Sequence, residues 1–412
     1  MAVFGIIAEY NPFHNGHRLQ VAKLRALDPD ARFIAVMSGG FTQRGEAAVL
    51  NKWERARRAV ENGLDLVLEL PFAFAGRSAQ FFAAGGVQLL ARLGVVSTLA
   101  FGSELADLDA LREMVERSFS PAVATERCRK MRAGCSYAAA QAGAMAGGED
   151  KKAKAIRQPN TILAVEYLKA LRIYAPQMAP LVLPREQAAH HETVLCGEIA
   201  SAAAIRQELF HSRPDWAKIE AAVPVGTLAG LRQQKKAGLP DMEQLSRTVL
   251  ALLLTGGVAT LREIYGMSEG LEHRFLAAAE ISGSLRALTE AVRCKRYPAS
   301  RIRRTFLCLL LSLSRDAVRR FDESGPLYAR VLAFNDRGRG LLREIRTKGD
   351  IPLITRLRDC LPARRLREGT PSPMQEMLAL DVHATGLWSL SLPSPGRRAM
   401  DFTTSPVYLP GG

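Results

Sequence analysis

The sequence contains few cysteines and lacks the spacings that would join them in a site. Its six cysteines are scattered, with no Cys-x-x-Cys pair, so the sequence indicates neither a zinc site nor a disulfide framework. Long apolar runs are also lacking, because the stretch at 306–313 is too short to cross a bilayer. The first residues lead into a predicted strand, without a basic segment or a cleavage site. We therefore expect a cytoplasmic protein with reduced thiols and no membrane partner.

Acidic residues are the scarcer charged class. The 412 residues include 56 Lys and Arg against 41 Asp and Glu, which gives a formal net charge of +15. A chain this basic favours an anionic partner, and the alternative is a basic surface that only keeps the protein in solution. The length allows two or three domains with a sizeable core.

Short apolar strands alternate with helices in the first half of the chain. Strands are expected at 3–8, 32–40, 64–71, 97–104 and 178–186, and helices at 15–27, 51–62, 78–93 and 158–171. This alternation predicts a Rossmann-like, doubly wound parallel sheet of the α/β class. From residue 201 onward the pattern is almost entirely helical, and 393–412 is rich in Pro, Gly and Ser. We therefore expect an α/β domain at 1–210 and a mainly helical region at 211–412 with an irregular tail.

Two of the seven histidines, His14 and His17, directly follow the first predicted strand. Three residues apart, they share a face in the first turn of a helix, where unpaired N–H groups and the helix dipole favour an anion. Gly16 between them lets a ligand approach the backbone. The pattern predicts a nucleotide across the carboxyl end of the sheet, with both imidazoles donating to phosphate oxygens. The alternative is that one histidine caps the helix and the other lies on the surface.

His-x-Gly-His after the first strand resembles the signature of the HIGH-type nucleotidylyl transferase superfamily, which attacks ATP at the α-phosphate. Further segments, in order, resemble the bacterial tRNA(Met) cytidine acetate ligase family. They are EYNPFHNGH (9–17), SGGFTQRGEAAVLNKWERAR (38–57), GLDLVLELP (63–71), FGSE (101–104), PNTILAVEYLKAL (159–171), SAAAIR (201–206) and KRYPASRIRR (295–304).

The resemblance implies an ATP-dependent ligase that converts acetate to acetyl-adenylate and transfers the acetyl group to N4 of the wobble cytidine in elongator tRNA(Met). It implies His14 and His17 as catalytic residues. The implied ATP-binding residues are Ile7, Ala8, Glu9, Tyr10, Asn11, Pro12, Phe13, His14, Asn15, Gly16, His17, Arg18, Leu19, Gln20, Gly102, Asn160, Arg185, Ser201 and Arg206. Magnesium is expected with the ATP phosphates, although no dedicated carboxylate site is apparent.

The chain departs from the family pattern at two positions. Ala203 stands where the family has a threonine, so one hydroxyl contact to the triphosphate is missing, and His190 stands where it has an aromatic residue. The segment after the second strand leaves two interpretations open. Arg44 and Lys52 either belong to a solvated helix face or lie near acetate or the acceptor cytidine.

Basic residues are concentrated in the second half of the chain. Seven Lys and Arg fall within 286–304 and ten within 337–367, which is the charge pattern of a surface that binds a phosphate backbone. The predicted RNA-binding residues are Lys295, Arg296, Tyr297, Arg301, Arg303 and Arg304, with Tyr297 stacking on an unpaired base. The alternative is a solvated basic face. Two further functions remain open: an adenylyltransferase for a small molecule, and a tRNA-binding protein without catalysis.

Overall fold

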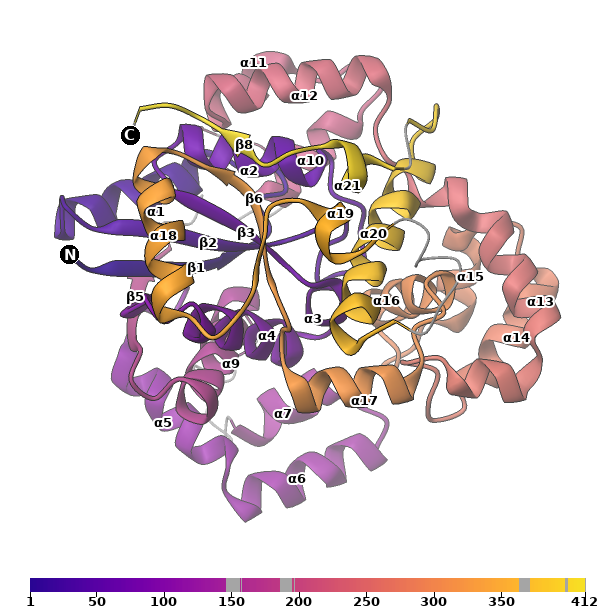
Figure 1. Ribbon diagram of the computed structural model, residues 1–412. Coiled ribbons are helices and arrows are strands. Elements are labelled where there is room, and N and C mark those ends of the chain that lie inside the picture. Colours follow the sequence, from indigo (N-terminus) through magenta and orange to yellow (C-terminus); the bar gives the residue numbers. More distant parts are fainter. Residues whose placement is uncertain are drawn as a thin grey trace.

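The computed structural model describes residues 1–145, 156, 158–185, 195, 197–362, 371–396 and 399–411. A central sheet runs through the molecule, with helices on both of its faces and a group of helices beyond one end (Figure 1). The strand order is β5-β4-β1-β2-β3-β6-β7, and β8 pairs with β6. The sheet is the frame on which every later element is placed.

The first five strands are parallel to one another, as the alternating pattern predicts. They are β1 (Val3–Ala8), β2 (Arg32–Ser38), β3 (Leu66–Leu70), β4 (Thr98–Ser103) and β5 (Ala179–Pro184). Their apolar residues alternate between two cores: Ile34 and Val36 face one, whereas Phe33 and Met37 face the other. A strand buried on both faces needs such a nearly continuous apolar run. The predicted Rossmann-like, doubly wound fold is therefore confirmed.

The helices that connect these strands are α1 (Asn15–Leu27), α2 (Lys52–Glu61), α3 (Phe72–Ala75), α4 (Ala79–Arg92), α5 (Leu108–Ser118), α6 (Pro121–Arg132), α7 (Tyr137–Met145) and α9 (Pro159–Tyr174). Of these, α1, α2, α4 and α9 begin and end close to the predicted positions, and the sequence analysis gives no bounds for the others. β2 and β3 extend the sheet on one side of β1, and β4 and β5 extend it on the other side. The strand order therefore reverses at β1, and doubly wound folds bind ligands in the crevice at that point.

Helices fill most of the chain between β5 and residue 324. They are α10 (Ala202–Phe210), α11 (Trp216–Ala222), α12 (Val225–Ala237), the 3₁₀ helix η1 (Met242–Leu245), α13 (Ser246–Glu263), α14 (Leu271–Ile281), α15 (Leu285–Val292), α16 (Ala299–Leu310) and α17 (Arg315–Ser324). Buried residues of α13 to α17 join the same apolar core as one face of the sheet. These helices lie beyond the carboxyl ends of the parallel strands (Figure 1).

One helical segment is more apolar than the sequence analysis allowed. By length and composition, residues 242–263 could cross a membrane. A single such helix among the described residues is weak evidence for a membrane span, because the core helix of a soluble protein passes the same test. The segment is not a continuous helix, because Gly257 has φ 65° and ψ 167° and interrupts α13. Val249, Leu253 and Leu261 are buried in the shared core. The sequence analysis considered only the run at 306–313 and did not identify this longer segment.

The chain returns to the sheet after α17. β6 (Ala329–Phe334) pairs antiparallel with β3, and β7 (Leu353–Ile354) and β8 (Val407–Tyr408) flank it. The sequence analysis expects no strand after residue 210, because a short, mostly apolar segment such as ARVLAF does not distinguish a buried strand from a buried helical turn. The remaining helices are α18 (Asp336–Lys348), α19 (Leu357–Cys360), α20 (Pro373–Leu390) and α21 (Met400–Thr403). The expected irregular tail thus contains a short helix and an edge strand.

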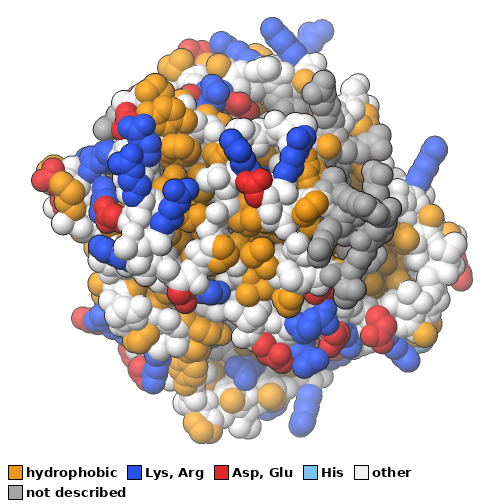
Figure 2. Space-filling model, viewed as in Figure 1, with side chains coloured by type: hydrophobic (Ala, Val, Ile, Leu, Met, Phe, Trp, Pro, Cys, Tyr) orange, Lys and Arg blue, Asp and Glu red, His pale blue; other side chains and the backbone are white. Residues whose placement is uncertain are grey.

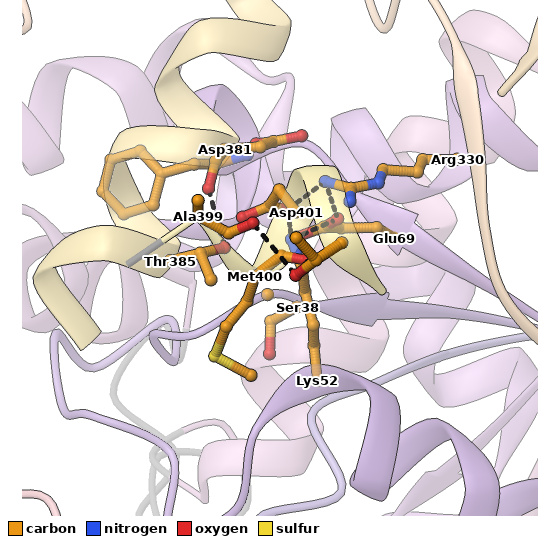
Figure 3. A network of polar contacts seen from close by, with 12 residues as sticks. Ser38, Lys52, Glu69, Arg330, Asp381, Thr385, Ala399, Met400 and Asp401 are labelled. Atoms are coloured by element: carbon orange, nitrogen blue, oxygen red, sulfur yellow. Dashed lines mark hydrogen bonds and ion pairs between the residues drawn. The ribbon is translucent and has the colours of Figure 1, made fainter. Parts of the chain in front are cut away.

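A buried ionic network fastens the C-terminal segment to the sheet (Figure 3). The Lys52 Nζ lies 2.8 Å from Glu69 Oε1 and 2.7 Å from Asp401 Oδ1, and Arg330 contacts the same two carboxylates. Burial alone would raise the pKa of Asp401, but the charges of Lys52 and Arg330 hold it below its usual value. Burial raises the pKa of neighbouring Asp381 to about 7. With 1% of its side chain exposed, Lys52 is neither a solvated residue nor a ligand of acetate or cytidine.

Candidate active site

A cleft of about 1330 Å³ opens at the carboxyl ends of the parallel strands. Its walls include the segment that follows β1, the loop after β2, the region between α3 and α4, the end of β4, and the residue that follows β5. Because the strand order reverses at β1, the cleft lies where a doubly wound sheet separates its crossover connections. Both His14 and His17 line it.

The two histidines cap the first turn of α1 through hydrogen bonds to the backbone. His14 is the N-cap residue, and its Nδ1 accepts a hydrogen bond of 3.0 Å from the Gly16 N–H. His17 Nδ1 accepts one of 3.3 Å from the His14 N–H, so the pair forms a reciprocal capping box. The ring centroids are 3.8 Å apart. Capping therefore involves both histidines, and it does not exclude a ligand, because each ring keeps its Nε2.

Both rings are neutral at physiological pH. Burial lowers the pKa of His14 to about 3, and the charges of Arg185 and Arg206 act in the same direction. Burial, with His14 and Arg185, also holds the pKa of His17 well below its usual value. Since Nδ1 accepts a hydrogen bond in each ring, the single proton of the neutral imidazole lies on Nε2. The site thus offers two N–H donors beside the N-terminus of α1.

Gly16 is required by the histidine itself. A Cβ at this position would lie 2.9 Å from His14 Cε1 and 3.0 Å from His14 Nδ1. The missing side chain therefore leaves room for the ring, a reason that the sequence analysis, which assigned the space to a ligand, did not give.

We expect Gly16→Ala to lower turnover about 100-fold, because it displaces the His14 ring from its position. The free energy of unfolding should change by less than about 1 kcal/mol, since the better helix propensity of alanine offsets the disturbed His14 cap. Pyrophosphate release and urea unfolding measure the two effects. The matched control is Gly340→Ala in α18, where no atom lies within 4 Å of the added Cβ. Wild-type turnover in Gly16→Ala would contradict the role given to the ring.

A second group of polar side chains faces the cleft from β4, β5 and α9. Glu104 accepts hydrogen bonds from the Asn160 side chain at 2.5 Å and from the Thr161 N–H at 2.8 Å. Asn160 Oδ1 in turn accepts from Arg185 Nη1 at 2.9 Å. A Cβ on Gly102 would lie 3.0 Å from Arg185 Cγ, so this glycine lets the arginine cross β4. Glu104 is a positioning residue that the sequence analysis quoted within FGSE but did not assign.

The N-terminus of α10 forms the wall opposite that group. Ser201 is its N-cap residue, and the Ser201 Oγ accepts a hydrogen bond of 3.1 Å from the Ala204 N–H. Arg206 donates to the Asn11 carbonyl at 2.9 Å and lies 3.2 Å from Glu46 Oε2. Ala203 also lines the cleft. SAAAIR therefore brings an arginine to the segment that follows β1.

The stretch at 7–20 contributes to the cleft unevenly. Its lining members are Ile7, Ala8, Glu9, Tyr10, Asn11, His14, His17 and Gln20. Its other members, all among the described residues, support this wall from behind or lie outside it: Pro12, Phe13, Asn15, Gly16, Arg18 and Leu19. Asn15, for example, donates to the carbonyls of Glu198 and Ala221 at 3.1 and 2.8 Å, which ties α1 to the α10–α11 region.

Comparison with known proteins agrees with this geometry. The model of the HIGH Nucleotidyl Transferase family matches residues 1–401. Relatives named tRNA(Met) cytidine acetate ligase include those of Syntrophomonas wolfei, 39% identical over 99% of both chains, and Alkaliphilus metalliredigens, 34% identical over 99% of both. The chain belongs to the tRNA(Met) cytidine acetate ligase family.

Crystal structures of a member of this ligase family have the same fold. The apo structure of Thermotoga maritima TmcAL matches with a TM-score of 0.90 and 32% identity over 100% of both chains. The structure of that protein bound with alpha-thio ATP matches with a TM-score of 0.89 and 31% identity, again over 100% of both.

The cleft that the two histidines line continues into the first basic cluster, at 286–304. Arg296, Arg301 and Arg304 line the same cleft, Arg303 lies 3.2 Å from Glu46, and Lys295 is exposed. Arg44 also lines the cleft and is exposed, which distinguishes it from Lys52.

One prediction about the basic half, the stacking of Tyr297 on a base, is wrong, and RNA binding by the second basic cluster stays a prediction. Tyr297 is 4% exposed, its hydroxyl donates to the Glu269 carbonyl at 2.6 Å, and it belongs to the helical core, so it does not stack on a base. Most described members of the second basic cluster lie on α18 (Figure 2), namely Arg337, Arg339, Arg343, Arg346 and Lys348, whereas Arg356 and Arg358 lie at α19. On α18, Arg337 donates to the carbonyls of Asp30 and Ala31, before β2 begins. Arg337 is thus at the amino ends of the parallel strands, whereas the cleft lies at their carboxyl ends.

Two remaining predictions concern residues or ligands that the structure does not place. His190 and the acidic residue that follows His191 lie outside the described residues. Within the described part of the chain, no group of three or more His, Cys, Asp or Glu side chains could hold a metal ion. Magnesium therefore stays a prediction that depends on ATP.

Proposed function

We propose that this protein is an ATP-dependent ligase that acetylates N4 of the wobble cytidine of elongator tRNA(Met). The observation that carries the proposal is the pair of imidazoles that cap the N-terminus of α1 and line the cleft, where the strand order of the sheet reverses. The name of the relatives, tRNA(Met) cytidine acetate ligase, supports the choice of substrates. ATP and tRNA are both cytoplasmic, and we propose that location for the enzyme.

In the first step, a carboxylate oxygen of acetate attacks the α-phosphorus of ATP. The bond from that phosphorus to the β-phosphate bridging oxygen breaks, and pyrophosphate leaves with both electrons of the bond. The Nε2–H groups of His14 and His17 donate to the oxygens of the α-phosphate, on which charge develops. Neutral donors suit this task, because they need no proton exchange with solvent during the reaction. The product is acetyl-adenylate.

The nucleotide is held by the groups that face each other across the cleft. Arg185 and Asn160 bind the nucleotide from the β4–β5 side, in an orientation that Glu104 fixes through its hydrogen bond to Asn160. Arg206 binds the β- and γ-phosphates from α10, since a guanidinium bonds phosphate oxygens in pairs. Ser201 holds α10 in position as its N-cap residue.

In the second step, N4 of cytidine attacks the acetyl carbon, and the bond from that carbon to the phosphate oxygen breaks. AMP leaves with both electrons of the bond, and one N4 proton passes to solvent. The base must first leave its stack to enter the cleft, at a cost of roughly a few kcal/mol. Lys295, Arg296, Arg301, Arg303 and Arg304 bind the surrounding RNA phosphates. Arg296, Arg301 and Arg304 share one cleft with the histidine pair, which supports a continuous path from the RNA to the adenylate.

The test is an assay with purified protein, ATP, labelled acetate and bulk tRNA, in which each component is omitted in turn. The proposal predicts acetate-dependent exchange of pyrophosphate into ATP without tRNA, and label in tRNA when all components are present. Transfer of AMP to a small metabolite would instead support an adenylyltransferase. Binding of tRNA without ATP turnover would support a binding protein.

We expect Lys295→Ala and Arg296→Ala each to weaken tRNA binding and to reduce the slope of log K against log salt concentration by about 1. Each side chain contributes one positive charge at the cleft side of the molecule. Filter binding at several salt concentrations measures the slope. The control is Arg343→Ala, an exposed arginine on α18, which packs against β2, β3 and β6 and does not line the cleft; this variant should leave the slope unchanged. Equal effects of all three variants would contradict the assignment of the RNA face.

A further inference from the structure

The loop between β2 and α2 connects the two halves of the cleft. Phe41 and Ala47 form an antiparallel bridge, and the turn between them is closed by hydrogen bonds of 2.9 Å from the Thr42 N–H to the Glu46 carbonyl and from the Gly45 N–H to the Thr42 carbonyl. Gly45 has φ 75°, and a Cβ there would lie 2.7 Å from the Arg304 backbone nitrogen. The loop backbone therefore rests directly on α16.

The carboxylate of Glu46 in this loop is shared by two arginines from different helices. Its Oε2 lies 3.2 Å from Arg206 on α10, and its Oε1 lies 3.2 Å from Arg303 on α16. The first arginine belongs to the nucleotide side of the cleft and the second to the basic RNA side. Glu46 is 29% exposed, so water and phosphate can reach the three side chains.

One carboxylate cannot neutralise two guanidinium groups at once. If a polyphosphate neutralises Arg206, Glu46 is no longer attracted to Arg206 and pairs with Arg303 alone. If an RNA phosphate neutralises Arg303, the carboxylate pairs with Arg206. An anion bound at one arginine therefore leaves Glu46 paired with the other arginine, where the carboxylate competes with a second anion and weakens its binding.

We propose that Glu46 is a positioning residue that orders the two half-reactions, an inference that rests on the proposed function. While the triphosphate occupies Arg206, Glu46 pairs with Arg303 and weakens the hold on the RNA backbone. After pyrophosphate leaves, Arg206 recovers Glu46 and Arg303 becomes available to RNA. The enzyme thus holds tRNA more tightly once the adenylate has formed than while ATP is intact.

The experiment measures the Kd of tRNA with and without a saturating non-hydrolysable ATP analogue. In the wild type we expect the analogue to weaken tRNA binding roughly fivefold, the low end of measured coupling between sites, because the three side chains are partly exposed. AMP should leave the tRNA affinity unchanged, because it carries no β- or γ-phosphate. Linkage also requires tRNA to weaken binding of the analogue by the same factor.

The decisive variant is Glu46→Gln, which removes the charge and keeps the shape of the side chain. The hydrogen bonds that close the loop use the backbone of residue 46, so the loop should persist. We expect tighter binding of tRNA and of the analogue measured separately, and a coupling below about twofold. The control is Glu54→Gln on α2, whose carboxylate pairs with Arg58 away from the cleft and should leave the coupling intact.

Three results would overturn the inference. A wild type without coupling would exclude it, and so would a Glu46→Gln variant that keeps the fivefold effect, since direct repulsion between the anions would then suffice. Arg303→Ala should also abolish the coupling, and its persistence there would exclude the assigned partner. If the analogue failed to bind at all, the proposed function itself would be contradicted, and the inference with it.

Discussion

Replacing His14 with asparagine is expected to lower acetate-dependent pyrophosphate exchange by about 10²–10³-fold and to leave the protein folded. Asparagine is among the best N-cap residues, so its side-chain oxygen can accept the Gly16 N–H in place of the His14 Nδ1. It does not carry a donor at the position of Nε2. The variant therefore separates the cap of α1 from the donor to the phosphate. Exchange of labelled pyrophosphate into ATP measures the first, and urea unfolding the second.

The comparison with alanine completes this experiment. His14→Ala loses both the donor and the cap and should cost about 1 kcal/mol more stability than His14→Asn. The two variants should be equally slow, because neither has the Nε2–H group. Near-wild-type exchange by His14→Asn, with exchange lost only in His14→Ala, would mean that the histidine acts only as a cap.

Replacing Lys52 with methionine is expected to reduce the free energy of unfolding by about 3–5 kcal/mol. The ammonium lies between Glu69 and Asp401, both almost fully buried, and its removal leaves those carboxylates with Arg330 as their remaining cation. Methionine has a similar length and leaves little empty space, so the effect reports mainly the unpaired charge. Urea unfolding, followed by far-UV circular dichroism, measures it.

The matched control is Lys218→Met on α11. Lys218 pairs with Asp215 at 3.3 Å, but the two side chains are 57% and 43% exposed, so water screens this pair and its loss should change stability little. Equal losses of stability in the two variants would show that the buried network does not hold the C-terminal segment.

The C-terminal segment matters because it supports the cleft from behind. The Trp388 indole N–H donates to the Ala48 carbonyl at 2.7 Å, and a Cβ on Gly40 would lie 2.9 Å from Trp388 Cβ. The loop that carries Glu46 is therefore held by α20 on one side and by α16 on the other. Helices and strands that follow residue 324 thus shape an active site whose histidines lie near the N-terminus.

The local parts of the fold could be predicted because their signals are local. An apolar run indicates a buried strand, and a proline followed by a polar segment indicates a turn and then a helix. Residues of β1, the Asn11-Pro12 turn and α1 follow this order. The capping box formed by His14 and His17 lies within four residues, so the first helical turn and its two histidines could be placed from the sequence.

What could not be predicted depends on partners far away along the chain. From the sequence alone, Lys52 is a residue of a charged helix with no sign of burial, because its buried partner Asp401 lies 349 residues further along the chain. Tyr297 lies between basic residues in the sequence, yet α14 and α16 enclose it. The pairing of β3 with β6 likewise joins segments that no local pattern relates. Glu46 belongs to this class, because its two arginines come from α10 and α16.

The most direct test of the account is a crystal structure of this protein with a non-hydrolysable ATP analogue. The account predicts oxygens of the α-phosphate roughly 2.7–3.2 Å from the Nε2 atoms of His14 and His17, at the N-terminus of α1. It also predicts the β- and γ-phosphates at Arg206. A triphosphate bound elsewhere in the cleft, with no contact to either imidazole, would contradict it.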